Sequence, residues 1–408
     1  MTDPATPEPG SADGFALSAL TQAELAAWLR LDLTPGIGRA TARRLLAAFG
    51  SAEAIWQQPP PRWREVVTVQ QASRLAQEPK GLAEQLARTA LWLRTPGNTG
   101  ATVLAHTLLP LGHPQYPQSL LDTEDPPLML YVQGEARWLG SAPVWFPYPA
   151  SLAIVGSRSP SPQGAQNARS LAQALAEAGL CIVSGLAQGI DAAAHAGALR
   201  AAAASPSRPA TIAVVGTGLD QVYPRQHALL AAEIALHGLL VSEYPLGSPP
   251  LAQHFPQRNR IISGLAQGTL VVEAALKSGS LITARLASEQ GREVFAIPGS
   301  IHAPQSRGCH ALLRQGAKLV ETASDVLEEL QGVKQQPPAP SGTPTPISVS
   351  ETQDPLLAAL GHDPQSLDSL IERTGLGAAE LQARLLDLEL EGEVARMPGG
   401  RFQRLARG

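Results

Sequence analysis

Ser151–Leu199 reads SLAIVGSRSPSPQGAQNARSLAQALAEAGLCIVSGLAQGIDAAAHAGAL, and this stretch decides the fold. Its apolar run Leu152–Val155 is short enough for a fully buried strand, and Ser161-Pro162 then opens a helix of small and apolar residues. A second short strand, Cys181–Val183, precedes another helix that begins near Gly189. This β-α-β-α order, with small residues at both strand-to-helix turns, predicts a parallel sheet whose turns can receive an anion.

The same alternation continues to about residue 330. The further strands expected are 211–215, 239–241, 269–272 and 293–297, with helices at 228–236 and 280–289 between them. Such a pattern predicts the α/β class: a Rossmann-like, doubly wound, mostly parallel sheet covered on both faces. Ligands of open α/β sheets bind beyond the carboxyl ends of the strands, so the position of the site is predicted before its ligand is known.

The composition is that of a globular protein with two or three domains. The chain has 408 residues, of which 44% are hydrophobic and 16% charged, and its net charge is −4. Two cysteines, Cys181 and Cys309, are too few for a disulfide framework or a cysteine-based zinc site. Because the sequence shows no signal peptide or 18-residue apolar span, we expect a cytoplasmic location and no membrane partner.

The segments before the sheet are expected to be a tail and a helical domain. Residues 1–14 are acidic and rich in Pro, Ala and Gly, which predicts a disordered tail. Residues 15–100 should form helices, at 16–31 and 40–49 among others, and a loop at Thr95–Thr99 should close the domain. The turn Leu33-Thr34-Pro35-Gly36-Ile37-Gly38 resembles a helix-hairpin-helix motif, which contacts DNA phosphates without reading sequence. A structural turn in a small SAM-like bundle is the alternative.

The segments after residue 112 are expected to be a Rossmann-like domain, a linker and a winged helix. The first covers 113–331, with a lead-in strand at 128–132, and the Pro-, Ser- and Thr-rich linker covers 332–353. Residues 354–408 predict a winged helix, with helices at 355–360, 366–374 and 378–390 and strands at 393–397 and 401–405. This last segment has 6 arginines and no lysines against 9 acids. Since a groove-reading helix is normally basic, a protein-contact role is favoured over DNA reading.

Two strand-to-helix turns carry the first candidate phosphate ligands. These are Gly156, Ser157 and Arg158 after the first strand, and Ser184, Gly185, Gln188 and Gly189 after the second. Arginine suits phosphate because its planar fork donates two hydrogen bonds at once. Pairing of Arg158 with an acid at the rim is the alternative. Asp191 and His195 lie four residues apart on one helix face and are interpreted as structural rather than catalytic, because no nucleophile or third ligand accompanies them.

Two later segments extend the candidate site. His254–Ile262 holds Phe255, Arg258, Asn259 and Arg260, whose arginines can grip phosphates while the phenyl ring stacks on a base. A core Phe255 with Arg260 in a salt bridge inside the fold is the alternative. One of the two arginines is expected to be structural. The turn Lys277, Ser278, Gly279 and Ser280 is a third phosphate-compatible element at a helix start, although Ser280 is also a plain N-cap candidate.

Motifs for nucleotide hydrolysis and dinucleotide binding do not occur in the sequence. No stretch matches G-x-x-x-x-G-K-[ST], and Gly216-Thr217-Gly218 is followed by Gln221 where the third glycine of G-x-G-x-x-G belongs. We therefore expect no catalytic residues, no metal and no cofactor.

The ordered motifs together resemble the DNA-processing protein A (DprA/Smf) family over residues 113–320. They are Val155-Gly156-Ser157-Arg158, Ser184-Gly185-Leu186-Ala187, Gly189-Ile190-Asp191, Ala194-His195, Tyr223-Pro224, Ser242-Glu243, Phe255-Pro256, Arg258-Asn259-Arg260, Ser278-Gly279-Ser280, Thr283-Ala284 and Pro298-Gly299. The resemblance implies a cytosolic protein that binds single-stranded DNA, protects it and loads the RecA recombinase in natural transformation. It also implies a homodimer through the Rossmann-like domain, with Arg158, Lys277, Arg258 and Asn259 on phosphates and Phe255 near a base.

Two departures and one alternative function accompany this resemblance. Gly308-Cys309-His310 stands where the family often has Gly-x-Asn, and the insert Ala201–Pro209 lengthens one helix–strand connection. The alternative is a Rossmann-like enzyme or sensor that acts on a nucleotide-derived small molecule. Asp191, Glu243 and Glu273, all near strand ends, would serve it.

Overall fold

The computed structural model describes residues 20–99, 102–139, 150–204, 208–332, 354–361, 364–397 and 399–405. The expected tail at 1–14 and all but the first residue of the expected linker at 332–353 lie outside these ranges. The chain divides into two compact units. One holds the residues up to 148 with 215–221 and 235–251, and the other holds the remainder. No helix of the described residues is long and apolar enough to cross a membrane.

The first unit begins with helices, as the sequence predicts. Thr21 caps the first of them, because its hydroxyl accepts from the Glu24 amide while the Glu24 carboxylate accepts from the Thr21 amide. The expected second helix is confirmed within one residue. The helices are α1 (Gln22–Leu33), α2 (Arg39–Phe49), α3 (Ala52–Gln57), α4 (Pro60–Trp63), α5 (Val69–Leu75) and α6 (Leu82–Arg94).

Antiparallel strands complete the first unit, and the sequence interpretation missed one of them. Gly97–Thr99 was expected in a loop but forms strand β1, which pairs antiparallel with β2 (Thr102–Pro110). β2 pairs with the expected lead-in strand β3 (Met129–Glu135), and β3 pairs antiparallel with β7 (Leu239–Ser242). The short helices α7 (Gln118–Leu121) and α8 (Ala136–Leu139) flank β3.

The second unit contains the parallel sheet that the opening stretch predicts. Its strand order is β6-β5-β4-β8-β9-β10, and every pair in it is parallel. The strands are β4 (Ser151–Val155), β5 (Cys181–Ser184), β6 (Thr211–Val214), β8 (Gly268–Val271), β9 (Glu293–Ala296) and β10 (Lys318–Leu319). The helices are α9 (Pro162–Glu177), α10 (Ile190–Arg200), α11 (Ala228–His237), α12 (His254–Gly264), α13 (Ser280–Glu289), α14 (Arg307–Arg314) and α15 (Ala323–Gly332).

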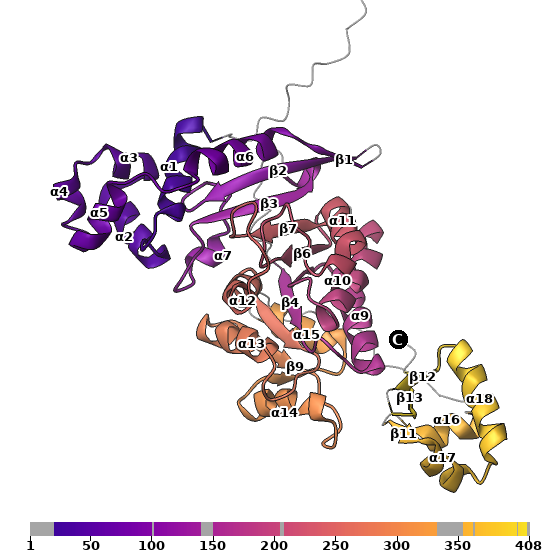
Figure 1. Cartoon of the computed structure of the whole chain (residues 1–408). Helices are drawn as coiled ribbons and strands as arrows, with labels where there is room; N and C mark the ends of the chain where they lie inside the picture. The colour runs from indigo at the N-terminus through magenta and orange to yellow at the C-terminus, as the bar shows by residue number, and fades with distance from the viewer. Residues whose placement is uncertain are drawn as a thin grey trace, which may run out of the picture. The chain divides into compact units, whose positions relative to one another are not determined.

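Helices cover both faces of this sheet, which confirms the doubly wound class. α9 and α10 lie on one side of the strands, and α12 and α13 lie on the other (Figure 1). Alanines such as Ala168, Ala172 and Ala194 are fully buried between α9, α10 and the sheet. A Cβ at Gly197 would overlap the Arg169 carbonyl oxygen, so the two helices approach as closely as backbone permits.

The C-terminal segment is a winged helix with a core of its own. Its helices are α16 (Pro355–Leu360), α17 (Leu367–Thr374) and α18 (Ala378–Leu390), each within one residue of the expected range. β11 (Gln365–Ser366), which the sequence interpretation missed, joins β13 (Arg401–Arg404) and β12 (Val394–Met397) in an antiparallel sheet of order β11-β13-β12. Leu356, Leu370, Leu381, Leu385 and Phe402 are among the residues of this core.

Candidate nucleic-acid interface

The turn after β4 is held from both sides by backbone hydrogen bonds. The Ser157 amide donates to the Glu273 carbonyl over 2.7 Å, and the Ser157 carbonyl accepts from the Ile190 amide over 3.1 Å. The Arg158 side chain is exposed, and its guanidinium carbon lies 5.8 Å from the centroid of the Phe255 ring. The turn therefore presents a cation against an aromatic face.

The loop after β5 is fixed by buried polar side chains. Asp191 accepts from the Gly185 amide at 3.1 Å, and His195 Nε2 accepts from the Leu186 amide at 3.3 Å. His195 Nδ1 contacts the Thr211 hydroxyl at 2.7 Å, and that hydroxyl donates to the Ile182 carbonyl. These bonds hold Leu186 at a φ of 56°. The structural interpretation of Asp191 and His195 agrees with these contacts.

The sequence predicts that the glycines of the two turns let an anion approach the backbone, but the structure shows protein atoms beside three of them. A Cβ at Gly156 would lie 2.7 Å from Ile190 Cγ1, and one at Gly189 would overlap the Ser157 carbonyl oxygen. Gly185 packs equally closely against the Arg258 guanidinium. The space beside all three glycines is filled by protein, so they allow the two turns to pack together rather than an anion to approach. Ser184 is also fully buried, and its hydroxyl donates to the Ile154 carbonyl at 2.6 Å.

Arg258 corrects the predicted site. Its side chain is 4% exposed and donates from Nη1 to the carbonyl oxygens of Gly185 and Val214. Because both acceptors are backbone groups at strand ends, this guanidinium links the loops after β5 and β6 and is not available to a DNA phosphate. Arg258 is thus the structural one of the two arginines. Arg260 is half-buried on the same helix.

Phe255 has an aromatic neighbour that the sequence interpretation left out of the site. The ring centroids of Tyr223 and Phe255 lie 5.3 Å apart at 42°, and Tyr223 is 46% exposed. The signal was present, because Tyr223-Pro224 is one of the motifs on which the family resemblance rests. Tyr223 and Phe255 are 32 residues apart in the sequence, so no local pattern indicates that their rings pair.

The Lys277–Ser280 turn is linked to the same helix. Asn259, one helical turn after Phe255, donates from its side chain to the Gly279 carbonyl at 3.4 Å. Lys277 and Gly279 are exposed, and a Cβ at Gly279 would meet nothing within 4 Å. Ser280 is buried and its hydroxyl lies 2.7 Å from that of Ser278, so these two serines bond to each other. Gln188 is exposed on the loop after β5.

The carboxylates considered for enzymatic chemistry are engaged with the backbone or with another charged side chain. Glu273 accepts from the Ser161 amide at 2.9 Å and from the Ser161 hydroxyl, and burial raises its pKa. Burial likewise raises the pKa of Asp191, which receives the two loop amides. Glu243, in the other unit, lies 3.6 Å from Arg39. Among the described residues no group of three or more His, Cys, Asp or Glu could hold a metal ion.

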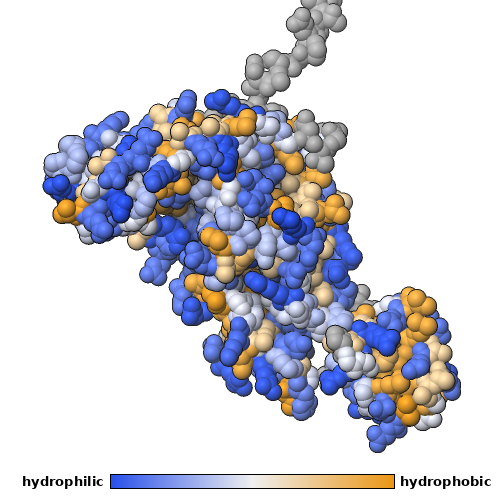
Figure 2. Space-filling model, in the orientation of Figure 1, coloured by the Kyte–Doolittle hydropathy of each residue, from blue (hydrophilic) through white to orange (hydrophobic). Residues whose placement is uncertain are grey.

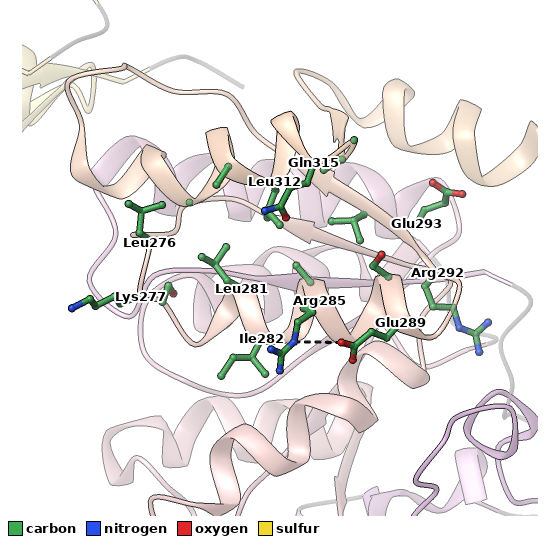
Figure 3. Close-up of a pocket in the computed structure, with 18 residues that line it drawn as sticks. Leu276, Lys277, Leu281, Ile282, Arg285, Glu289, Arg292, Glu293, Leu312 and Gln315 are labelled. Atoms are coloured by element: carbon green, nitrogen blue, oxygen red, sulfur yellow. Dashed lines mark ion pairs between the residues drawn. The ribbon is translucent and has the colours of Figure 1, made fainter.

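Two other features lie apart from these residues. In the turn between α1 and α2 the Ile37 amide donates to the Thr34 carbonyl at 3.1 Å, and Arg39 and Arg43 on α2 pair with Asp125 at 2.7 and 2.6 Å. A pocket of about 660 Å³ lies between α13 and α14, with Lys277 at one end and Arg292 at the other (Figure 3). Only Lys277 and Ser278 belong to both this pocket and the candidate site.

Comparison with known proteins identifies the family of the chain. The family model for DNA recombination-mediator protein A matches residues 107–331, and a model for the DprA winged helix domain matches residues 336–400. The chain belongs to this family. It is 44% identical to Protein Smf of Escherichia coli over 346 residues, which are 84% of this chain and 86% of that protein.

Further relatives extend the likeness. The chain is 48% identical to DNA processing protein DprA of Streptococcus pneumoniae over 53% of its own length and 71% of that protein. The crystal structure of that DprA superposes with a TM-score of 0.60 at 33% identity, covering 76% of this chain and 98% of the other. The family resemblance and the Rossmann-like fold are thereby confirmed.

Proposed function

We propose that this protein binds single-stranded DNA without chemical turnover, protects incoming DNA and loads RecA recombinase in natural transformation and DNA recombination. Membership of the DNA recombination-mediator family supports a role in DNA processing. The geometry of the exposed site supports a single strand as the ligand.

The observation that carries the proposal is the cation–aromatic group of Arg158, Phe255 and Tyr223. The guanidinium lies 5.8 Å from one ring centroid, and the two rings lie 5.3 Å apart. Aromatic faces stack on unpaired bases of any sequence, and an adjacent arginine holds the phosphate. Bases inside a duplex are already stacked on each other, so this combination favours a single strand.

The rest of the binding track lies along α12 toward the next turn. Asn259 connects α12 to Gly279, and Lys277 stands two residues before that glycine. We propose that a strand runs from Arg158 past Phe255 to Lys277, with the open backbone at Gly279 beside it. Arg260 and Gln188 remain candidate ligands at the borders of this track.

We propose further that two copies associate through the second unit. β10 is the last strand of its sheet, both of its residues are exposed, and Leu319 is 50% exposed. The outer edge of a terminal strand can pair with another chain, and the exposed apolar side chain of Leu319 adds a contact surface there. A dimer would also place two DNA tracks in one particle.

The test is a titration of fluorescent oligothymidylate and of a matched duplex. We expect the single strand to bind more tightly, with an affinity that falls steeply as salt rises. Arg158→Ala and Lys277→Ala should each weaken binding about tenfold, which corresponds to about 1.4 kcal/mol. Arg285→Ala is the matched control, because Arg285 is 68% exposed and already paired with Glu289. Equal affinity for duplex and single strand, unaffected by Arg158→Ala and Lys277→Ala, would refute the proposal.

RecA loading is tested by a separate assay of filament assembly. The protein should accelerate assembly of RecA filaments on DNA coated with a single-strand-binding protein, and Arg158→Ala should reduce that acceleration at limiting protein. If RecA filaments assemble at the same rate with and without the wild-type protein, this part of the proposal is refuted.

The enzyme or sensor alternative has a separate test. It requires release of a base or a sugar phosphate from free nucleotides, abolished by Glu273→Gln. The bonds from Ser161 to Glu273 argue for a capping role of this carboxylate instead.

A further inference from the structure

Helix α18 of the winged helix has two apolar faces. Leu381, Leu385 and Leu388 are buried in the domain core. Leu386 and Leu390 are 55% and 79% exposed, and Ala379 and Ala383 are exposed as well. Because each helical residue turns the side chain by about 100°, these last four residues form a stripe on the side opposite the buried leucines.

The exposed stripe has the spacing of a helix-docking surface. Ala379, Ala383, Leu386 and Leu390 stand at positions i, i+4, i+7 and i+11 of one helix. A helix that faces water on one side normally carries polar side chains there. Figure 2 shows hydrophobic residues gathered on the visible face of this domain, in the part where Figure 1 draws α18.

Acidic side chains border the stripe on both sides. Helical geometry places Glu380 and Asp387 along one edge and Glu389 along the other, and Arg384 is the only basic residue in the sequence of α18. Carboxylates in these positions repel DNA phosphates and anionic lipid. They would also repel the same carboxylates of a second copy if α18 packed against α18 of that copy.

We propose that this surface docks a basic amphipathic helix of a partner protein, with leucine-like side chains on the stripe and Lys or Arg beside the three carboxylates. Charge complementarity selects this occupant. The chain's own first 19 residues do not fit, because they carry Asp3, Glu8 and Asp13 and no Lys or Arg. The proposal does not depend on the DNA-binding function.

The experiment uses the full chain and two synthetic 15-residue peptides that share leucines at i, i+4, i+7 and i+11. One peptide carries lysines beside the leucines and the other carries glutamates. By fluorescence anisotropy, the lysine peptide should bind and the glutamate peptide should not. The double variant Leu386→Ser, Leu390→Ser should weaken binding at least tenfold. The charge variant Glu380→Gln, Asp387→Asn, Glu389→Gln should do the same, which covers the case in which the leucine variant misfolds.

Leu229→Ser is the control, because Leu229 is 85% exposed on α11, outside the winged helix. It should leave peptide binding unchanged. The proposal is overturned if both peptides bind alike or if both variants bind the lysine peptide as the wild type does. A change in oligomeric state on Leu386→Ser, Leu390→Ser would overturn it too, because the occupant would then be a second copy.

Discussion

Two arginines of the motif set have opposite roles, and their positions on secondary structure explain why. Arg158 follows a strand and lies on an exposed turn, whereas Arg258 lies on α12 with Ile261 and Ile262 at i+3 and i+4. Arg258, Ile261 and Ile262 are all buried. The sequence predicts that one of the two arginines in this segment is structural, and the i, i+3, i+4 spacing of Arg258 with the two isoleucines is the signal that indicates which one.

Arg258→Ala should destabilise the protein rather than act on DNA directly. The change leaves the Gly185 and Val214 carbonyls without their donor and removes the positive charge that lowers the pKa of buried Asp191 against the effect of burial. Losing one partner of a buried charge pair costs about 3–5 kcal/mol. Urea unfolding should show this loss, while Arg158→Ala stays within about 0.5 kcal/mol of the wild type. A fully stable Arg258→Ala protein with lost DNA affinity would contradict the structural role.

His195 should make stability fall in acid. Burial lowers its pKa from 6.5 to about 3. Above pH 6.5 the imidazole is neutral in both states, so it has no effect there. Below pH 6.5 the unfolded chain binds a proton that the folded chain refuses, so the free energy of unfolding falls by about 1.4 kcal/mol per pH unit.

The measurement compares urea unfolding of the wild type and His195→Gln at several pH values. Between pH 6.5 and 5 the wild type should lose about 2 kcal/mol more than the variant. Parallel pH profiles would mean that His195 titrates normally in the folded protein.

At the scale of elements, α12 connects the parts of the candidate site. Phe255 and Asn259 share one of its faces, and through them the helix touches Tyr223 on one side and the Gly279 turn on the other. Arg258, at i+3 from Phe255 on the same helix, reaches the ends of β5 and β6. One helix therefore joins the exposed aromatic group to the buried network that fixes the loops.

The edge strand β10 carries the prediction on assembly. Leu319→Glu should convert a dimer to a monomer, because a carboxylate cannot be buried between two edges without a partner. Light scattering after gel filtration measures the mass, and Leu229→Glu on α11 should leave the dimer intact. A monomeric wild type, or a dimeric Leu319→Glu protein, would exclude this interface.

At the scale of the whole molecule, the parallel sheet and the winged helix each have a hydrophobic core. Among the described residues, the core of the parallel sheet ends at Leu330 and the core of the winged helix begins at Leu356. The winged-helix segment from 354 to 408 is acidic, with 9 acids against 6 arginines. Neither the core of its own nor the excess of acidic residues indicates that the winged helix contacts DNA.

A chain that ends at residue 332 should therefore keep its affinity for single-stranded DNA within about twofold, a change of about 0.4 kcal/mol. The same titration as for the full chain measures it, with circular dichroism as the check on folding. A loss of more than about tenfold would assign the winged helix a direct contact with DNA.

The sequence by itself determined the alternation of strands and helices, the winged helix and the family, because these depend on local periods and on ordered motifs. It did not predict β1, since Gly97-Asn98-Thr99 has weak strand propensity and becomes a strand through pairing with β2. Only the tertiary structure decided that Arg258 is buried, that Tyr223 meets Phe255 and that the turn glycines pack against protein. Each of these depends on a partner far away in the chain, and a local pattern carries no information about which distant residue fills the space beside it.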